Sequence, residues 1–580
     1  MCLPCCPSLA RRGQPGSSRR RGAGTHRRQS LSRTTRALSV GGSSAPSRKR
    51  LIRARRLKPN LSRTRLAKSV TRRAWPGSSS SQQRAQPGLR GGGKSKCSSS
   101  RVASAPKAAA ILGKAATARR KGQTAPDALA SPRPRAHTSA MEPRLLLLLL
   151  PLLALGSGAI LKRSESKEAW GYVQVRNNAH MFWWLYYASN PTKNFTELPL
   201  IMWLQGGPGA SGCGFGNFEE IGPLNTKLKP RNTTWLQAAS ILFVDNPVGS
   251  GFSYANDSSA FAKDVATVAS DMLVLLKEFF KSKTEFQTLP FYIFSESYGG
   301  KMTAAIALEL HKAIHAGSIK CNFSGAALGD SWISPLDSVL SWGPYLYSTS
   351  LLDDKGLTEV TAAAKEVMDA VNKKDYALAT QLWSKTEELI EQNTDGVNFY
   401  NILTKRAPAL QEREHEAIYL MRLYQRHVEH LHKDQLSDLM NGPIRKKLKI
   451  IPDSVKWGGQ SEEVFTNMAG DFMKPVIDIV DQLLAANVNV TIYNGQLDLI
   501  VDTMGQEAWV RKLKWPKLER FSQQKWKALY ICPESTETAA FYKSYENLAF
   551  YWILRAGHMV PADQGEMALK MVRMVTQQKH

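Results

Sequence analysis

The chain has 580 residues and a formal net charge of +30, a balance that points to nucleic acid or an anionic membrane as a partner. The charge is confined to one end, because residues 1–140 hold 33 lysines and arginines and a single acid, Asp127. The rest of the chain is almost neutral, which argues against nucleic acid as a partner of the folded part.

Residues 1–140 are rich in Arg, Ser, Gly and Pro, which predicts a disordered basic extension. A nucleic-acid-binding arm and an organelle transit peptide share that composition. The next segment argues against both, since a short basic start at Met141 precedes the apolar run Leu145–Leu155 and then small residues. This is the pattern of a secretory signal peptide at residues 141–159, and its apolar run is shorter than the ~20 residues that span a bilayer. We expect a mature protein that starts near Ile160 and has no stable membrane anchor.

Cysteines and glycosylation tripeptides characterise the rest of the chain. Only Cys213, Cys321 and Cys532 follow the signal peptide, so the fold can hold at most one disulfide and does not depend on a disulfide framework. Five Asn-x-Ser/Thr tripeptides also follow it, which together favour a secreted or lysosomal glycoprotein. Their asparagines are Asn194, Asn232, Asn256, Asn322 and Asn489.

From residue 160 onward, apolar strand patterns alternate with amphipathic helix patterns. The predicted strands are Met181–Ala188, Leu198–Leu204, Ser240–Val244, Phe291–Glu296, Asn487–Tyr493 and Leu548–Leu554, and the predicted helices are Phe261–Phe279 and Lys301–His315. Such alternation indicates βαβ units, and therefore an α/β fold whose central sheet is mostly parallel and flanked by helices.

A helical insertion interrupts this alternation. Strand signals are scarce in residues 336–440, where helical patterns cover Ala362–Val371, Ala377–Ile390 and Glu412–Leu431. We therefore predict a cap over the sheet at residues 336–440, with the α/β core divided between residues 160–335 and 441–580.

Three polar residues stand where predicted strands end, in the chain order Ser297, Asp498, His558. This is the order of the α/β-hydrolase fold, in which the serine occupies a sharp strand-to-helix turn. A serine hydroxyl becomes nucleophilic when a histidine takes its proton, and a carboxylate orients that histidine. The N–H of Tyr298, together with that of Gly207 in the turn Gln205–Gly209, would form an oxyanion hole.

Four segments resemble the serine carboxypeptidase family, and the resemblance extends over residues 165–578. These segments are Trp203–Gly209, Asp245–Tyr254, Glu296–Lys301 and Gly557–Asp563. The resemblance implies an α/β-hydrolase fold and an enzyme that removes residues from peptide C-termini through an acyl-enzyme, favouring acidic pH. It implies peptide or protein substrates with a free C-terminus, and no cofactor.

The resemblance also implies how the substrate is held. Gln205, backed by Glu219 and Glu296, would bind its terminal carboxylate, and Phe218 and Met559 would line the pocket for the departing residue. The two glutamates can bind the carboxylate of the substrate only while they are protonated. This requirement fits an enzyme that is most active at acidic pH.

Three positions depart from the family pattern. The family usually has Asn at Gln205, Gly at Ser295 and Cys at Ala210. The longer Gln205 side chain shifts the carboxylate site, so two other functions stay open. The protein could be a catalytically weak secreted glycoprotein of the same fold that acts mainly by binding, or an acyltransferase that uses the same residues.

Two groups of histidines are candidate metal sites. His311 and His315 share a helix face, but the pair lacks the zinc-protease order because residue 312 is Lys. His427, His430 and His432 lie among charged residues. We interpret both groups as solvated surface and expect no metal.

Overall fold

A computed structural model describes residues 167–404 and 419–578 of the chain. The basic extension, the signal peptide and the first part of the predicted helix Glu412–Leu431 lie outside the described residues. The centre is a sheet whose strands are β1 (Glu168–Arg176), β2 (Ala179–Tyr186), β3 (Leu200–Leu204), β4 (Ser240–Val244), β5 (Tyr254–Ala255), β6 (Pro290–Glu296), β7 (Asn322–Gly329), β8 (Val490–Gly495), β9 (Lys527–Leu529), β10 (Ala540–Tyr545) and β11 (Leu548–Ile553).

The strands are ordered β1-β2-β4-β3-β6-β7-β8-β11-β10-β9, and β5 pairs with β2. The strands from β4 to β11 in that order are parallel to one another. The pairs at both edges, β1 with β2, β2 with β4 and β10 with its two neighbours, are antiparallel. The predicted mostly parallel sheet is therefore a mixed sheet, parallel in its centre and antiparallel at its edges.

Helices cover both faces of this sheet. The longer helices are α2 (Val265–Ser282), α3 (Tyr298–His315), α4 (Pro335–Ser348), α5 (Asp354–Asn372), α6 (Tyr376–Thr394), α7 (Tyr419–His427), α10 (Ser461–Phe472), α11 (Ile477–Ala485), α12 (Thr503–Val510) and α15 (Gly565–Val575). Other helices are η2 (Gly212–Ile221), η7 (Glu429–His432), α8 (Asp434–Leu439), η8 (Met440–Ile444), α9 (Arg445–Leu448), α13 (Leu518–Ser522) and α14 (Val560–Asp563).

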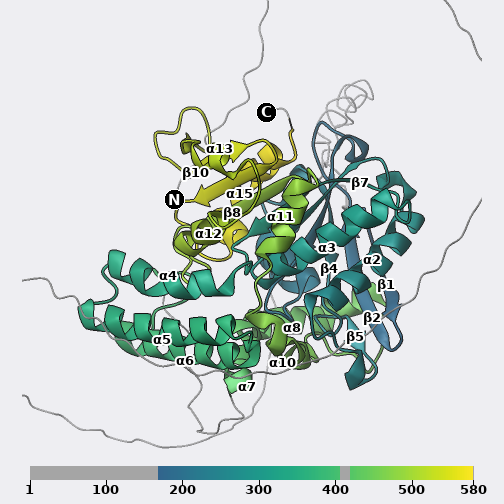
Figure 1. Cartoon of the computed structure of the whole chain (residues 1–580). Helices are drawn as coiled ribbons and strands as arrows, with labels where there is room; N and C mark the ends of the chain where they lie inside the picture. Colours follow the sequence, from purple (N-terminus) through teal and green to yellow (C-terminus); the bar gives the residue numbers. More distant parts are fainter. Residues whose placement is uncertain (1–166, 405–418, 579–580) are drawn as a thin grey trace, which may run out of the picture. The chain divides into compact units, whose positions relative to one another are not determined.

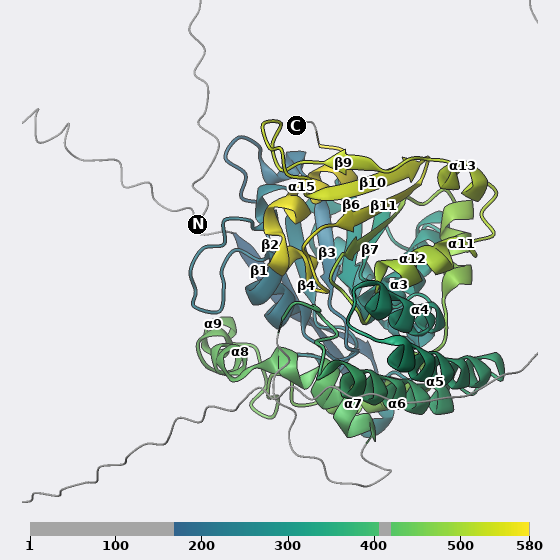
Figure 2. The same cartoon turned by 90° about the vertical axis from the view of Figure 1, so that its left-hand side faces the viewer.

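Alternating side chains of the buried strands divide the core into two apolar clusters. In β2, Met181, Trp183 and Leu185 belong to the cluster that includes side chains of α2, α3 and α11. Helices α3 and α11 lie side by side (Figures 1 and 2). Phe182 and Trp184 belong to the cluster on the opposite face, which includes η2 and α15. This two-residue period is the one expected of a strand buried on both faces.

The helical insertion follows β7. Helices α5 and α6 lie side by side, away from the sheet, and α4 connects them to it (Figure 2). Asp353 and Asp375 cap these two helices, accepting hydrogen bonds from Gly356 N at 2.7 Å and Leu378 N at 3.1 Å. The described part of the chain contains no helix long and apolar enough to cross a membrane.

Candidate active site

Ser297 stands on a sharp turn between β6 and α3. Its backbone has φ 62° and ψ −130°, a region that residues with a side chain rarely adopt. The Ser297 N–H donates to Gly329 O at 3.0 Å. A Cβ added at Gly206 would lie 2.5 Å from Ser297 Cβ, and one at Gly299 would lie 2.5 Å from Leu204 O. The turn therefore requires small neighbours, which is the sequence feature of a nucleophile turn.

Ser295, which stands where the family usually has Gly, is accommodated inside β6. Its side chain is fully buried, and its Oγ donates to Ala327 O at 3.3 Å. The hydroxyl of Tyr493 donates to Ser295 O at 2.9 Å. The serine hydroxyl is thus satisfied within the sheet, two residues before the turn, and leaves the Ser297 conformation intact.

Asp498 and His558 are joined by a hydrogen bond of 2.8 Å between Asp498 Oδ2 and His558 Nδ1. Asp498 Oδ1 accepts from Val501 N at 3.2 Å, and His558 N donates to Tyr400 O at 2.7 Å. A carboxylate that accepts from Nδ1 leaves the lone pair on Nε2, which has no hydrogen-bond partner among the described residues. Ser297, Asp498 and His558 follow β6, β8 and β11, parallel strands whose C-terminal ends share one edge of the sheet.

Two backbone N–H groups adjoin Ser297. Tyr298 is the first residue of α3, so its N–H has no acceptor within that helix. Gly207 follows the glycine that packs against Ser297, and its φ of 108° suits a residue without a side chain. Together they are the candidate pair of donors for an acyl-transfer site, and this role stays a prediction.

A buried amide lies beside a buried acid just before the turn. Gln205 Nε2 donates to Glu296 Oε1 at 2.9 Å, and Trp203 Nε1 donates to Gln205 Oε1 at 2.7 Å. An indole N–H can only donate, so Trp203 fixes which end of the amide faces Glu296. The orientation leaves the second N–H of the Gln205 amide for another acceptor.

Glu220 completes this cluster. Its carboxyl group is 1% exposed, and neither of its oxygens receives a hydrogen bond from a donor in the described residues. Burial raises the pKa of Glu220 to about 7, while contacts with Glu296 and Gln205 hold the rise back. Burial, followed by the charge of Glu220, raises the pKa of Glu296 well above its usual value. Burial therefore favours the protonated form of both carboxyl groups, so in acidic solution each of them can donate a hydrogen bond.

The resemblance implies Glu219 as a member of this cluster, whereas the structure places the side chain of Glu220 there. Glu219 is half-buried, and its carbonyl oxygen accepts from Arg231 Nη1 at 3.3 Å. Both glutamates lie in η2, a π-helix whose i→i+5 turn is wider than that of an α-helix. Adjacent side chains of a helix point in different directions, and here the side chain of Glu220 faces the cluster.

Phe218 and Met559 were predicted to line the pocket for the departing residue. Phe218 is 2% exposed and packs edge-on against Trp184, with 6.2 Å between ring centroids. Met559 is half-buried against the same apolar cluster. Their contacts are compatible with a shared pocket, and their contact with substrate stays a prediction.

The end of the insertion lies over the site, and the interpretation of His427, His430 and His432 as solvated surface is wrong. His427 is 3% exposed and contacts Tyr400 Oη at 2.9 Å and Glu387 Oε2 at 3.1 Å. The Tyr400 ring packs against the rings of His430 and His558, with centroids 4.9 and 5.0 Å apart. Tyr400, which belongs to the insertion, thus packs directly against His558.

The other histidine pair, His311 and His315, lies on the outer part of α3, with ring centroids 4.1 Å apart. Within the described ranges, neither histidine group comes together as three side chains able to hold one metal ion. The three described cysteines, Cys213, Cys321 and Cys532, are free.

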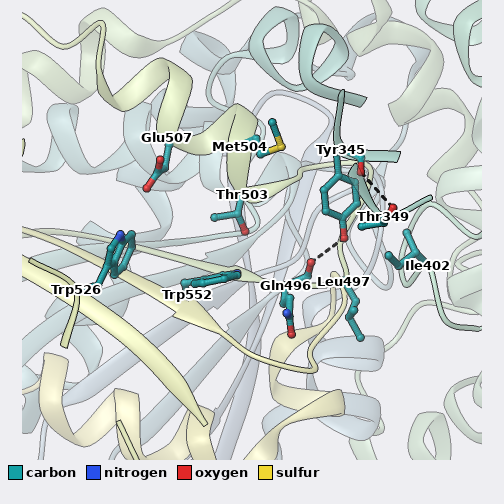
Figure 3. A pocket seen from close by; sticks show the side chains of 10 residues that line it. All are labelled: Tyr345, Thr349, Ile402, Gln496, Leu497, Thr503, Met504, Glu507, Trp526 and Trp552. Carbon is teal, nitrogen blue, oxygen red and sulfur yellow. Dashed lines mark hydrogen bonds between the residues drawn. The ribbon is translucent and has the colours of Figure 1, made fainter. Parts of the chain in front are cut away.

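A pocket of about 350 Å³ lies on one side of the loop that carries Asp498 (Figure 3). Gln496 and Leu497, which precede Asp498, form part of its wall, and Trp526 and Trp552 form another part. Its lining is largely apolar and includes none of the side chains of Ser297, Asp498 and His558. It is therefore distinct from the space in which those three groups act.

A serine on a strained turn and a buried histidine–carboxylate pair at the same edge of the sheet are the features of a serine hydrolase of the α/β-hydrolase fold. The chain belongs to the serine carboxypeptidase family, whose sequence model matches residues 159–578.

Similar proteins agree with this assignment. The chain is 71% identical to the retinoid-inducible serine carboxypeptidase of Rattus norvegicus over 75% of this chain and 97% of that protein. It is 70% identical to the human protein of that name, over 75% of this chain and 98% of that protein. A prohormone-processing carboxypeptidase of Saccharomyces cerevisiae has a similar fold, with TM-score 0.61 and 22% identity over 71% of this chain and 91% of that one.

Sequence reasoning missed three residues that the structure brings to the site: Glu220, Asp330 and Tyr400. Glu220 could have been found because it directly follows Glu219, the acid that the resemblance implied. For Asp330 the signal was the apolar run Ala326–Leu328, because a polar residue after a buried strand is a candidate site residue. No local signal singles out Tyr400, whose carbonyl oxygen meets His558 N from far along the chain.

Proposed function

We propose that this serine carboxypeptidase hydrolyses the C-terminal peptide bond of peptides and proteins through an acyl-enzyme on Ser297. His558 takes the proton from Ser297 Oγ as that oxygen attacks the carbonyl carbon, and then gives it to the departing amine. Asp498 orients His558 and stabilises its charged form. The N–H groups of Gly207 and Tyr298 stabilise the oxyanion. Water, activated by His558, then releases the peptide from Ser297.

The observation that carries this proposal is the buried cluster of Gln205, Glu220 and Glu296, the last of which directly precedes the proposed nucleophile Ser297. Three such buried groups suit a terminal carboxylate, which accepts hydrogen bonds from the amide and from protonated acids. An ordinary esterase has no need of such a cluster. Substrate then lies with its last peptide bond next to Ser297, which limits cleavage to the final residue.

Binding of this kind predicts a pH dependence. Because the pKa values of Glu220 and Glu296 are raised, both acids are protonated and act as donors in acidic solution. As the pH rises through about 7, Glu220 ionises and its charge faces that of the substrate. For an N-blocked dipeptide with a free C-terminus, kcat/KM should therefore fall across this range, mainly through a rise in KM. Steady-state kinetics from pH 4 to 8 would measure it.

The same dipeptide with an amidated C-terminus is the control. At pH 5 it should be cleaved at least 10-fold more slowly, the effect of about one hydrogen bond to a charged group. The difference should shrink above pH 7. Equal rates at pH 5 would argue against carboxylate recognition by this cluster. Adding an amine acceptor to the reaction would separate hydrolysis from acyl transfer, because transfer gives a new amide product.

We also propose that the protein enters the secretory route and is secreted or lysosomal. The signal-peptide pattern at residues 141–159 supports this, and the asparagines of all five acceptor tripeptides are exposed. Protein from a eukaryotic secretory host should begin near Ile160 and lose mass on enzymatic removal of N-linked glycans. Intact mass and N-terminal sequencing would test both statements. A start within residues 1–140, or an unchanged mass, would contradict them.

A further inference from the structure

A second carboxyl group lies beside the histidine–carboxylate pair. Asp330 follows β7, the strand between β6 and β8, and it is fully buried. Its N–H donates to Tyr493 O at 2.8 Å, and its Oδ1 accepts from Gly495 N at 2.8 Å. Its φ of 41° is left-handed, which Asp and Asn tolerate better than other residues. These contacts fix the Asp330 carboxyl group against the end of β8.

From this position Asp330 reaches the catalytic pair. One ring nitrogen of His558 and one carboxylate oxygen each of Asp330 and Asp498 lie within 4.8 Å of one another. Asp498 already accepts from Val501 N through Oδ1 and from His558 Nδ1 through Oδ2. Asp330 Oδ2, in contrast, has no donor among the residues that the structure describes. Two anionic carboxylates so close in a buried site would repel each other strongly, whereas a proton on one of them gives a hydrogen bond.

The surroundings favour the proton on Asp330. The titratable groups that face it are Asp498, His558, Glu220, Glu296 and Tyr493. Burial, followed by the charge of Asp498, raises the pKa of Asp330 well above its usual value. His558 is the one base in this set, and its Nδ1 is already bonded to Asp498.

We propose that Asp330 is a positioning residue that acts as a neutral acid, donating a hydrogen bond from its Oδ2–H to the carboxylate of Asp498. The proposal rests on the proposed roles of Asp498 and His558. The bond holds the Asp498 carboxylate in the orientation that accepts from His558 Nδ1. It also prevents a second negative charge from competing with Asp498 for that proton. Asp330 touches neither substrate nor the reacting atoms.

Two variants test this proposal. Asp330→Asn keeps an acceptor for Gly495 N and a neutral donor for Asp498, so kcat/KM should stay within a few-fold of that of the unmodified enzyme. Asp330→Ala lacks the donor, so kcat should fall about 10- to 100-fold with little change in KM, the effect of one hydrogen bond to a charged group. Asp330→Asn with the activity of Asp330→Ala would overturn the proposal, and so would unchanged activity in both.

A measurement independent of activity separates a neutral donor from a charged or merely structural residue. NMR would follow the titration of His558 in Ser297→Ala and in Ser297→Ala with Asp330→Asn. If Asp330 is neutral, the added change removes no charge and the midpoint should stay the same. A midpoint lower by about one pH unit or more in the Asn variant would show that Asp330 is an anion and would overturn the proposal, even where Asp330→Ala fails to fold.

Infrared spectra of the same two proteins at neutral pH provide the second readout. The carbonyl band of a protonated carboxyl group should be weaker in the protein with Asp330→Asn, because one neutral acid has been removed. An unchanged band would overturn the proposal. If the substrate experiments failed while these two signatures held, the proposed specificity would be wrong and the Asp330 assignment would stand.

Discussion

Ser297→Ala is expected to lower kcat for an N-blocked dipeptide by on the order of 10⁶-fold, the loss typical of a missing serine nucleophile. No acyl-enzyme can form without Ser297 Oγ, while Gly207, Tyr298 and the Gln205 cluster still bind substrate. KM should therefore change little. Release of the C-terminal amino acid at pH 5, measured over hours with high enzyme concentration, would quantify the residual rate.

Ser295→Ala is the matched control, two residues earlier on the same strand. Its hydroxyl donates to Ala327 O inside the sheet, so its loss should change activity no more than a few-fold. Thermal unfolding should show a cost of about 1 kcal/mol for the missing hydrogen bond. If Ser295→Ala were as inactive as Ser297→Ala, the loss would reflect damage to the turn. If Ser297→Ala retained activity, the proposed nucleophile would be wrong.

The central strands could be predicted because their sequences carry the signal of burial on both faces. Ser240–Val244 was predicted with the bounds that the structure has, and Phe291–Glu296 differs by one residue. β7 was missed because Asn322–Gly329 contains two glycines, two alanines and no β-branched residue, so its strand conformation depends on pairing with β6 and β8. β1 and β10, near the sheet edges, are only half-buried and have a weaker apolar pattern.

Some residues of the candidate site could be predicted from the local sequence, whereas others depend on contacts that form only in the folded chain. Ser297, Asp498 and His558 each follow a strand, so chain order and position suggested a common edge before any contact was known. The position of Glu220 in the cluster could not be predicted, because the sequence pattern does not indicate that η2 is a π-helix. Asp330 follows the strand that was itself missed.

The insertion shows the same limit. His427 looked like surface because it lies among charged residues, yet its partner Glu387 is a buried side chain from α6. The hydrogen bonds of His427 to Tyr400 and Glu387 form only once the insertion has folded back over the sheet. The charged residues around His427 therefore led to a wrong prediction of surface exposure, because charged side chains can be buried when they pair with one another.

Glu220→Ala is expected to lower kcat/KM for a free C-terminal dipeptide by about 10- to 100-fold at pH 5, the effect of a lost hydrogen bond to a charged group. The amidated dipeptide should lose far less, because it has no carboxylate for Glu220 to bind. Glu296, relieved of the neighbouring charge that raises its pKa, should ionise at lower pH, so the remaining activity should also decline at lower pH. Kinetics with both substrates would measure these effects.

Glu219→Ala is the control for this variant, since it removes the same side chain one residue earlier in η2. Glu219 is half-buried, and only its backbone carbonyl oxygen bonds to Arg231, so activity should stay within a few-fold. A large loss in Glu219→Ala alone would return the role to the position that the resemblance implied. Equal losses in both variants, with lowered thermal stability, would indicate that η2 had been disrupted. Only an isolated loss in Glu220→Ala fits a π-helix that turns one of two adjacent acids toward the substrate.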